Sequence, residues 1–248
     1  MNRKKNNACI ATVLFVILLV LQGTVTYAQD KGKELTEPKV IQPGKRGKAP
    51  SDAIILFEKG SLDNFESIAD GAPANWKVSG KTFTVNPKST NIQTKQVFGD
   101  CQLHVEWRTP VKDVRAKKEG QSCGNSGVYL MGKYEIQVLN SFKNKTYFNG
   151  QAGAIYSNYP PLVNASLKPG RWQVYDIIFK APTYNGALIT PGYFTVFHNG
   201  VLVQNHMEIT DPTTSANSNA PEGSSKLPLM LQNHGSEVSY RNIWIREL

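Results

Sequence analysis

The stretch Tyr134-Glu135-Ile136-Gln137-Val138-Leu139-Asn140 decides the fold prediction, because its polar and apolar side chains alternate. A run of this kind is typical of a β-strand with one buried face. Ile136 and Val138 point to one side, and Glu135 and Gln137 point to the other. A carboxylate and an amide seldom share the face of a strand unless that face is wet. The stretch therefore predicts a strand that presents polar groups to a groove.

Two further stretches are expected to lie beside this strand. The segment before it, residues 123–132, reads as a loop, a short strand and a tight turn. A turn at Gly132-Lys133 would make the two strands an antiparallel hairpin. Residues 229–235 near the C-terminus mix polar and apolar groups in a similar way. We expect the three stretches to line one groove.

The rest of the chain also predicts strands rather than helices. Residues 102–108 alternate cleanly, as in a half-buried antiparallel strand. Asn199-Gly200 between two alternating runs predicts a hairpin with a type I′ turn. Further short strands are expected at 54–57, 75–78, 81–85, 172–179, 227–232 and 240–245. About a dozen short strands separated by turn signals predict an all-β fold, a jelly-roll sandwich of two antiparallel sheets.

The N-terminus has the features of an export signal. Three basic residues precede the apolar run 10–21, and small residues follow up to Ala28. This pattern is typical of a secretory signal peptide, and the run is too short for a comfortable membrane span. We therefore expect a signal peptide at 1–28, a flexible linker at 29–50 and one domain at 51–248. The mature chain is expected to have no membrane span and to be periplasmic or extracellular.

Charge and cysteine content bear on partners and on disulfides. The formal net charge is +9, but residues 1–28 contribute three basic groups and no acid, which leaves 25 − 19 = +6. No concentrated basic face is evident, so nucleic-acid binding is not expected.

Cys101 and Cys123 remain after export. They are either joined in a disulfide, which an oxidising compartment permits, or are two buried thiols.

Several polar side chains on separate strands suggest a carbohydrate site. Amides, carboxylates, arginine and histidine together suit the hydroxyl groups of a sugar, although each alone is also typical of a solvated strand face. Glu135 is either an exposed carboxylate or a general base, and His234 is either a turn residue or a proton donor. The candidate binding residues are Glu106, Arg108, Asn125, Gln137, Tyr156, Gln232 and Arg241. No metal-ligand spacing or phosphate-binding loop is present, and no cofactor is predicted, although a divalent metal held by loop oxygens stays open.

The order and spacing of these motifs resemble the 3-keto-disaccharide hydrolase family. The resemblance covers residues 54–248 and rests on the segments 98–108, 125–130 and 134–139. It continues in the segments 153–156, 169–172, 198–200, 231–235 and 240–243. The resemblance implies a concanavalin A-like jelly roll with a sugar-binding concave face. The implied substrates are glycosides already oxidised at C3.

The ketone at C3 implies an elimination mechanism. It acidifies the proton on C2, so a base can form an enolate that expels the leaving group on C1, and water then adds. We expect Glu135 to be the base and His234 the acid or enolate partner, with the other candidates holding hydroxyl groups. Two alternatives remain. One is a conventional two-carboxylate glycoside hydrolase that pairs Glu135 with Glu106, and the other is a lectin-like binding module without turnover.

Overall fold

The structure is a computed structural model that describes residues 36–45, 47–113, 119–213 and 223–248. The predicted signal peptide and the first linker residues, 29–35, lie outside this part. The chain divides into two compact units, Met1–Val40 and Ile41–Leu248. The described residues of the first unit, 36–40, have no regular secondary structure. The second unit begins at Ile41, ahead of the boundary at residue 51 that the sequence predicted.

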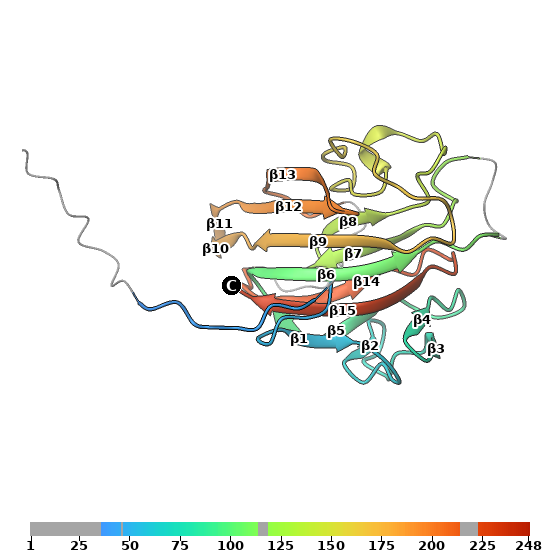
Figure 1. The fold of residues 1–248 in the computed structure, drawn as a ribbon. Helices are drawn as coiled ribbons and strands as arrows, with labels where there is room; N and C mark the ends of the chain where they lie inside the picture. The colour runs from blue at the N-terminus through green and yellow to red at the C-terminus, as the bar shows by residue number, and fades with distance from the viewer. Residues whose placement is uncertain (1–35, 46, 114–118, 214–222) are drawn as a thin grey trace, which may run out of the picture. The chain divides into compact units, whose positions relative to one another are not determined.

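The second unit contains two large antiparallel sheets (Figure 1). The larger sheet consists, in spatial order, of β13 (Val201–Ile209), β12 (Gly192–His198), β9 (Gln173–Lys180), β6 (Cys101–Arg108), β15 (Ser239–Glu247), β4 (Thr82–Thr84) and β3 (Lys77–Ser79), with β1 (Ile54–Phe57) also paired with β15. The smaller sheet consists of β2 (Phe65–Ser67), β5 (Ile92–Phe98), β14 (Leu227–Leu231), β7 (Ser126–Leu130) and β8 (Tyr134–Val138). A separate hairpin is formed by β10 (Thr183–Asn185) and β11 (Ala187–Thr190). Among the described residues the only helical element is the short 3₁₀ turn η1 (Phe148–Gly150). The predicted all-β sandwich is confirmed.

The hydrophobic core lies between the two sheets. Alternate residues of β6 (Leu103, Val105 and Trp107) and of β8 (Tyr134, Ile136 and Val138) belong to one buried cluster. The core also contains polar contacts that join the sheets. The hydroxyl groups of Ser126 and Tyr240 are 2.7 Å apart. Because side chains alternate along a strand, the residues between these core positions point to the outer faces of the sandwich.

Both hairpins that the sequence predicted are present. Asn199 and Gly200 have φ of 53° and 78°, the left-handed values that a type I′ turn requires. In the hairpin of β7 and β8 the positive φ values fall on Met131 and Gly132, one residue earlier than predicted. The strands β2, β5, β10 and β11 were not predicted from the sequence.

Residues 41–50 are attached to the domain rather than separate from it. The backbone carbonyl of Gly47 accepts hydrogen bonds from Nδ2 of Asn242 and Nε1 of Trp244, both at 3.0 Å. Gly47 has φ of 78°, and a Cβ there would lie 3.3 Å from the ring of His104. Glycine therefore suits the close approach of this segment to the outer face of the larger sheet.

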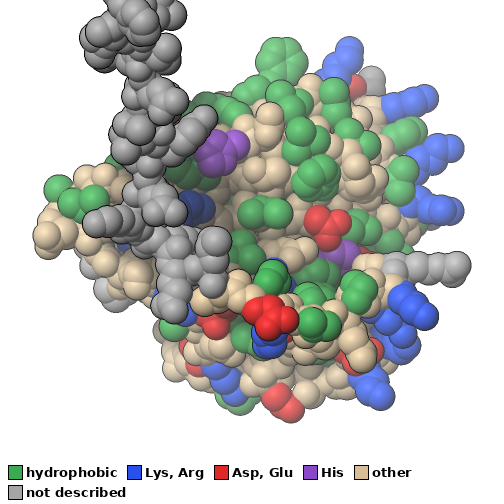
Figure 2. Space-filling model, turned by 60° about the vertical axis from the view of Figure 1, so that its left-hand side comes forward, with side chains coloured by type: hydrophobic (Ala, Val, Ile, Leu, Met, Phe, Trp, Pro, Cys, Tyr) green, Lys and Arg blue, Asp and Glu red, His purple; other side chains and the backbone are tan. Residues whose placement is uncertain are grey.

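One face of the molecule is drawn in Figure 2. Lys and Arg side chains project mainly along its right-hand edge, and the centre carries hydrophobic, acidic and uncharged side chains. This face does not present a continuous basic surface. Within the described part of the chain, no helix is long and apolar enough to cross a membrane.

Candidate functional site

The three stretches that were expected to line one groove are neighbours in the smaller sheet. β14 pairs with β7, and β7 pairs with β8. Along β8 the core residues alternate with Glu135 and Gln137, so these two side chains lie on the outer face of the sheet. This outer face is called the Glu135 face below. Its defining residues are Tyr129, Glu135, Gln137, Tyr156 and Gln232.

The strand register places Glu135 between two tyrosines. Tyr129 is paired directly with Glu135 across β7 and β8. On the other side of β8, Ile136 forms an antiparallel bridge with Ile155, and the N–H of Tyr156 donates to the carbonyl of Glu135. Residues directly opposite each other in antiparallel strands share a face. Tyr129 and Tyr156 therefore flank the carboxyl group of Glu135.

Two residues further along β8, a second set of outward-facing residues lies side by side across β14, β7 and β8. Gly127 is paired with Gln137, and the N–H of Gln232 donates to the carbonyl of Gly127 at 3.0 Å. Gly127 leaves a notch between the two glutamines, and the carboxyl group of Glu135 lies in it. A Cβ at Gly127 would be 2.3 Å from Oε1 of Glu135. The glycine is therefore required by the position of the carboxyl group.

Glu135 is buried in a setting that disfavours its charge. Only 2% of the residue is exposed. Burial raises its pKa to about 8, and a hydrogen bond from Tyr129 acts in the opposite direction. In the described part of the molecule, Oε2 of Glu135 has no hydrogen-bond partner. A carboxyl group with a pKa near neutrality is suited to general acid–base catalysis.

The two glutamines of the Glu135 face each carry an unsatisfied oxygen. Oε1 of Gln137 and Oε1 of Gln232 are buried and have no partner among the described residues. Their amide nitrogens are engaged: Nε2 of Gln137 donates to Gln121, and Nε2 of Gln232 donates to the hydroxyl of Tyr129. A buried polar atom without a partner costs about 1–3 kcal/mol. Ligand hydroxyl groups would satisfy these oxygens.

Gln121 is an important residue that the sequence analysis missed. Its Oε1 accepts from Nε2 of Gln137 at 3.0 Å and from Nδ2 of Asn125 at 3.3 Å. Its Nε2 donates to the hydroxyl of Thr146 and the carbonyl of Gly150. Gln121 therefore orients Gln137. It lies in a predicted loop without alternation, so no sequence pattern marked it.

Asn125 has a positioning role in this arrangement. It is 4% exposed, and its Nδ2 donates to the backbone carbonyl of Gln121 at 2.7 Å. Its N–H donates to the hydroxyl of Ser236. Asn125 thus joins the segment before β7 to the loop after β14, and both of these border the Glu135 face.

Tyr147 and Tyr156 form a pair at the edge of the Glu135 face, next to solvent. The hydroxyl groups of Tyr147 and Tyr156 are 2.6 Å apart, and Tyr147 is 46% exposed. Burial is the main cause that raises the pKa of Tyr147; the hydrogen bond with Tyr156 and the Tyr156 charge come next, and the charge of Glu135 adds the smallest contribution. Tyr147 was not predicted as a site residue, because tyrosine in a long loop is common.

His234 lies in the loop between β14 and β15, two residues beyond Gln232, and is exposed. The residues around it are fixed. Nδ2 of Asn233 donates to the carbonyl groups of Asn86 and Ser89, and the hydroxyl of Ser236 donates to Asp113. The position borders the Glu135 face. The role of His234 as a proton donor stays a prediction.

Three predicted binding residues do not belong to this face. Glu106, Arg108 and Arg241 lie on β6 and β15 and point away from the core on the outer face of the larger sheet. The sandwich separates them from Glu135. The alternation in the sequence predicted that each of these strands has one polar face. It did not predict which of the two sheets contains them. The prediction that these residues share a groove with Glu135 is therefore wrong.

The carboxyl group of Glu106 is held by hydrogen bonds from neighbouring side chains on the outer face of the larger sheet. Nε of Arg241 donates to Oε2 of Glu106 at 2.6 Å, and Nδ2 of Asn242 donates to Oε1 at 2.8 Å. Burial acts to raise the pKa of Glu106, but the hydrogen bonds from His104, Asn242 and Arg241 outweigh it and lower the pKa to about 2. Glu106 cannot be the second carboxylate of a two-carboxylate site with Glu135.

Cys101 and Cys123 do not form the disulfide that the sequence left open. Cys101 is a free, buried thiol at the start of β6. Cys123 precedes Gly124, whose Cβ would lie 2.6 Å from Thr109, just beyond the other end of β6. An eight-residue strand spans about 26 Å, whereas a disulfide requires Cα atoms within about 7 Å.

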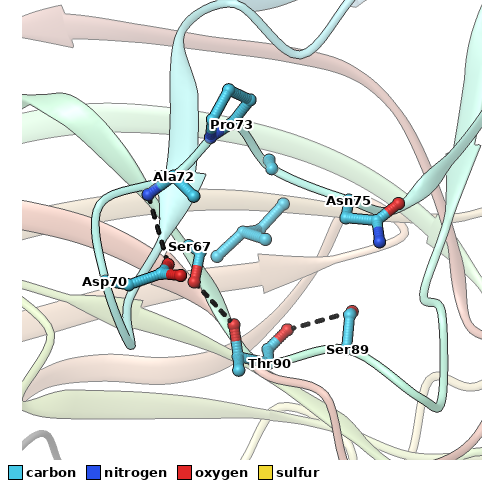
Figure 3. Close-up of a pocket in the computed structure, with 9 residues that line it drawn as sticks. Ser67, Asp70, Ala72, Pro73, Asn75, Ser89 and Thr90 are labelled. Atoms are coloured by element: carbon cyan, nitrogen blue, oxygen red, sulfur yellow. Dashed lines mark hydrogen bonds between the residues drawn. The ribbon is translucent and has the colours of Figure 1, made fainter.

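A polar hollow of about 540 Å³ lies away from the Glu135 face, at the edge formed by β2 and the start of β5. Figure 3 shows hydrogen bonds that join Ser67 to Thr90, Ser89 to Thr90 and Asp70 to Ala72 within it. The hydroxyls of Ser67 and Thr90 are 3.0 Å apart, and Asp70 accepts from the N–H of Ala72. These groups are satisfied within the protein, unlike the oxygens of the Glu135 face. The Glu135 face is therefore the stronger candidate site.

The described residues contain no group of three or more His, Cys, Asp or Glu side chains that could hold a metal ion. The polar groups of the Glu135 face comprise one carboxyl group with amides and phenols. This donor set suits a neutral ligand rich in hydroxyl groups.

Comparison with known proteins places this geometry in context. Residues 52–246 match the family described as the 3-keto-alpha-glucoside-1,2-lyase-like domain. A protein from Parabacteroides distasonis ATCC 8503, described as a "putative glycosyl hydrolase", is 44% identical, and the alignment covers 88% of this chain and 95% of that chain with a TM-score of 0.79. A search of curated proteins gives no match.

Two more distant structures support the fold alone. Both come from the same organism and carry the same description. One is 21% identical, with 79% of this chain and 99% of that chain covered and a TM-score of 0.55. The other is 17% identical, with 79% and 94% covered and a TM-score of 0.56.

Proposed function

Because the chain belongs to the family of 3-keto-alpha-glucoside-1,2-lyase-like domains, we propose that it is a carbohydrate-active enzyme that cleaves 3-keto-glycosides by eliminating the group bound to C1. The description of the 44% identical protein as a glycosyl hydrolase supports the broader class. The observation that carries the proposal is the buried carboxyl group of Glu135, with unsatisfied oxygens around it. The substrate is an oligosaccharide or another glycoside.

Glu135 removes the proton on C2 in this proposal. The C3 ketone accepts the electron pair as an enolate, the C1–O bond breaks as a C1–C2 double bond forms, and the leaving oxygen takes a proton. A pKa near 8 makes the ionised form a stronger base than an ordinary carboxylate while leaving a useful fraction ionised near neutral pH. Water then adds at C1, and the proton held by Glu135 returns to C2.

The amide oxygens of the Glu135 face hold the sugar. Oε1 of Gln137 and Oε1 of Gln232 accept hydrogen bonds from sugar hydroxyl groups, because each is buried without a partner among the described residues. Their strands are two places apart, so their backbones are about 10 Å apart. Gly127 lies between them, and the carboxyl group of Glu135 occupies the space above it.

A proton donor is required for the leaving oxygen. His234 remains our candidate, because it is exposed and lies two residues beyond Gln232. A histidine ring can hold a proton on either nitrogen and release it, which suits proton donation. In this proposal the paired hydroxyl groups of Tyr147 and Tyr156 stabilise the enolate oxygen by donating a hydrogen bond to it.

The first experiment is a turnover assay. Residues 29–248 are incubated with p-nitrophenyl 3-keto-glucoside and with its unoxidised parent, with and without a chelator. We expect release of p-nitrophenol from the keto substrate alone. Release from the parent would contradict elimination, and release from neither would favour a binding module that acts without turnover.

We also propose that the protein is exported, with cleavage after Ala28. The proposal rests on the basic residues 3–5, the apolar run 10–21 and the small residues before Ala28. N-terminal sequencing of the protein purified from the periplasm or medium should begin at Gln29. A chain that keeps Met1 would contradict it.

A further inference from the structure

We propose that the hollow beside η1 holds the aglycone of the substrate, and that this aglycone is an aromatic ring carrying a hydroxyl group. The inference rests on the proposed function, because it specifies the group that leaves when Glu135 acts. The hollow has a volume of about 420 Å³. Its lining residues are Phe148, Gln151, Pro160, Pro161, Leu162, Val163 and Asn164.

The hollow is connected to Glu135 through the protein chain and its hydrogen bonds. Tyr156 lies beside Glu135 on the edge of β8, and the next residue, Ser157, donates its N–H to the carbonyl of Asn149 in η1. Phe148 belongs to the same turn and directly follows Tyr147. The tyrosine pair therefore links the segment beside Glu135 to η1, and in our proposal the substrate extends from Glu135 along this direction.

The exposed fraction of the side chains rises from Glu135, past the tyrosine pair, to Phe148 in η1. Glu135 is 2% exposed, Tyr147 is 46% exposed and Phe148 is 80% exposed. The buried end holds the reacting sugar in the proposed function. The part of the substrate that extends outward from it is then the leaving group, which lies over Phe148.

Five of the seven residues that line the hollow are apolar, and the large ones among them are unusually exposed to solvent. Leu162 and Val163 are 61% and 50% exposed, and they line the same hollow as Phe148. A cluster of exposed large apolar side chains is typical of a binding surface rather than of ordinary solvated surface. Aromatic ligands gain more than area burial from a contact with a phenyl ring. These groups favour an aromatic aglycone over another sugar.

The hollow is held in place by the rest of the domain. The N–H of Leu162 donates to the carbonyl of Val203 at 2.8 Å, and Nδ2 of Asn164 donates to the carbonyl of Ser141 at 2.8 Å. Two consecutive prolines, Pro160 and Pro161, restrict the backbone before them. The surface is thus formed before a ligand arrives, as is usual for small-molecule sites.

One polar group indicates the substituent on the ring. Oε1 of Gln151 is buried and has no partner in the described part of the chain, and Gln151 lines the hollow. An amide oxygen accepts hydrogen bonds and cannot donate them. A phenolic hydroxyl on the aglycone would donate to it.

The test compares three 3-keto-glucosides with different aglycones: 4-hydroxyphenyl, phenyl and methyl. Each variant is compared with the wild type on each substrate, so that differences in leaving-group reactivity cancel. Leu162→Ala alters the hollow, and Ile189→Ala on β11 is its control because the two residues are 61% and 62% exposed. Gln151→Met removes the acceptor at similar volume. Far-UV circular dichroism confirms folding of each variant.

We expect Leu162→Ala and Phe148→Ala to lower kcat/KM for the two aryl substrates by about threefold to tenfold, and to leave the methyl substrate within twofold of the wild type. Gln151→Met should abolish the preference for 4-hydroxyphenyl over phenyl. Ile189→Ala should change nothing. Equal losses on all three substrates, or no loss on any, would overturn the proposal.

The test distinguishes failure of the aglycone site from failure of the proposed cleavage of 3-keto-glycosides. If the wild type cleaves none of the three substrates, the proposed function fails. Calorimetric binding of unoxidised 4-hydroxyphenyl glucoside and methyl glucoside then decides the aglycone site. Tighter binding of the aryl glucoside that Leu162→Ala weakens would support it, and equal or undetectable binding of the two glucosides would overturn it.

Discussion

Tyr129 lies directly opposite Glu135 on the paired strands β7 and β8, and its side chain hydrogen-bonds to the Glu135 carboxyl group. Nε2 of Gln232 donates to the hydroxyl of Tyr129 at 3.0 Å. The phenol thus links an amide on β14's C-terminal side to the carboxyl group on β8. Burial raises the pKa of Glu135, and the bond from Tyr129 limits that rise.

Tyr129→Phe should raise the pKa of Glu135 further, because it removes the hydrogen bond that favours the ionised carboxylate. If ionised Glu135 is the base, the acidic limb of the kcat/KM profile should move to higher pH. The measurement is the pH dependence of p-nitrophenol release from the 3-keto substrate. An unchanged or acid-shifted limb would contradict the role of Tyr129.

Glu135→Gln should lower kcat by a factor of about 10²–10⁴, the usual contribution of a general base. The matched control is Glu106→Gln, which alters a carboxylate on the outer face of the other sheet. Because Glu106 bonds to Arg241 and Asn242, this control should lose stability rather than activity at a temperature where it is folded. Full activity of Glu135→Gln, or equal losses in both variants, would sink the base assignment.

Glu135 should also make stability depend on pH. The ordinary pKa of its carboxyl group, 4.5, applies to the unfolded chain, whereas the pKa in the folded protein is about 8. The folded protein therefore holds this proton over a range in which the unfolded chain has lost it. The free energy of unfolding should fall as pH rises from about 4.5 to about 8, by roughly 5 kcal/mol at most. Below and above this window the contribution is constant.

Comparing wild type with Glu135→Gln isolates this effect from other groups. The variant cannot ionise at this position, so the difference in melting temperature between the two proteins should grow in favour of the variant from pH 5 to pH 8. A difference that does not change with pH would show that Glu135 has an ordinary pKa.

The sequence was sufficient for the hairpin of β7 and β8 because alternation and turn residues are local signals. Ile136 and Val138 identified the core side of β8, and Glu135 and Gln137 then had to lie on the opposite side. The sequence analysis expected residues 229–235 to line the same groove as this hairpin, and β14 pairs with β7 in the structure. These elements carry Tyr129, Glu135 and Gln137 of the Glu135 face.

The sequence was not sufficient for assigning strands to sheets. Glu106 on β6 shows the same alternation as Glu135 on β8, yet the two strands belong to different sheets. Alternation gives the face of a strand relative to its own core and contains no information on which layer it joins. Gln121 was missed for a related reason, because its partners Gln137 and Asn125 are brought to it only by the tertiary fold.

Cys101 should be inert to alkylation in the folded protein. It is completely buried, and burial raises the pKa of its thiol to about 12, so the reactive thiolate is scarce. Mass spectrometry after native iodoacetamide treatment should find Cys101 unmodified, whereas treatment in denaturant without reductant should modify it. A requirement for reductant in denaturant would show that Cys101 is in a disulfide.

Gly127→Ala should impair both stability and activity, although its backbone is ordinary extended strand. The added Cβ would lie 2.3 Å from Oε1 of Glu135 and 2.6 Å from Cε2 of Tyr129, so both side chains must move. We expect a loss of about 1–3 kcal/mol in the free energy of unfolding and of about 100-fold in kcat, because the displaced carboxyl group no longer reaches the C2 proton.

A double-mutant cycle with Glu135→Ala identifies the cause. When the carboxyl group is absent, Gly127→Ala loses its closest clash and keeps only the one with Tyr129, so its cost in the free energy of unfolding should fall by about 1 kcal/mol or more. Chemical denaturation of the four proteins measures this coupling. Additive costs would mean that the glycine is required by the strand itself, and the position of Glu135 would then need another explanation.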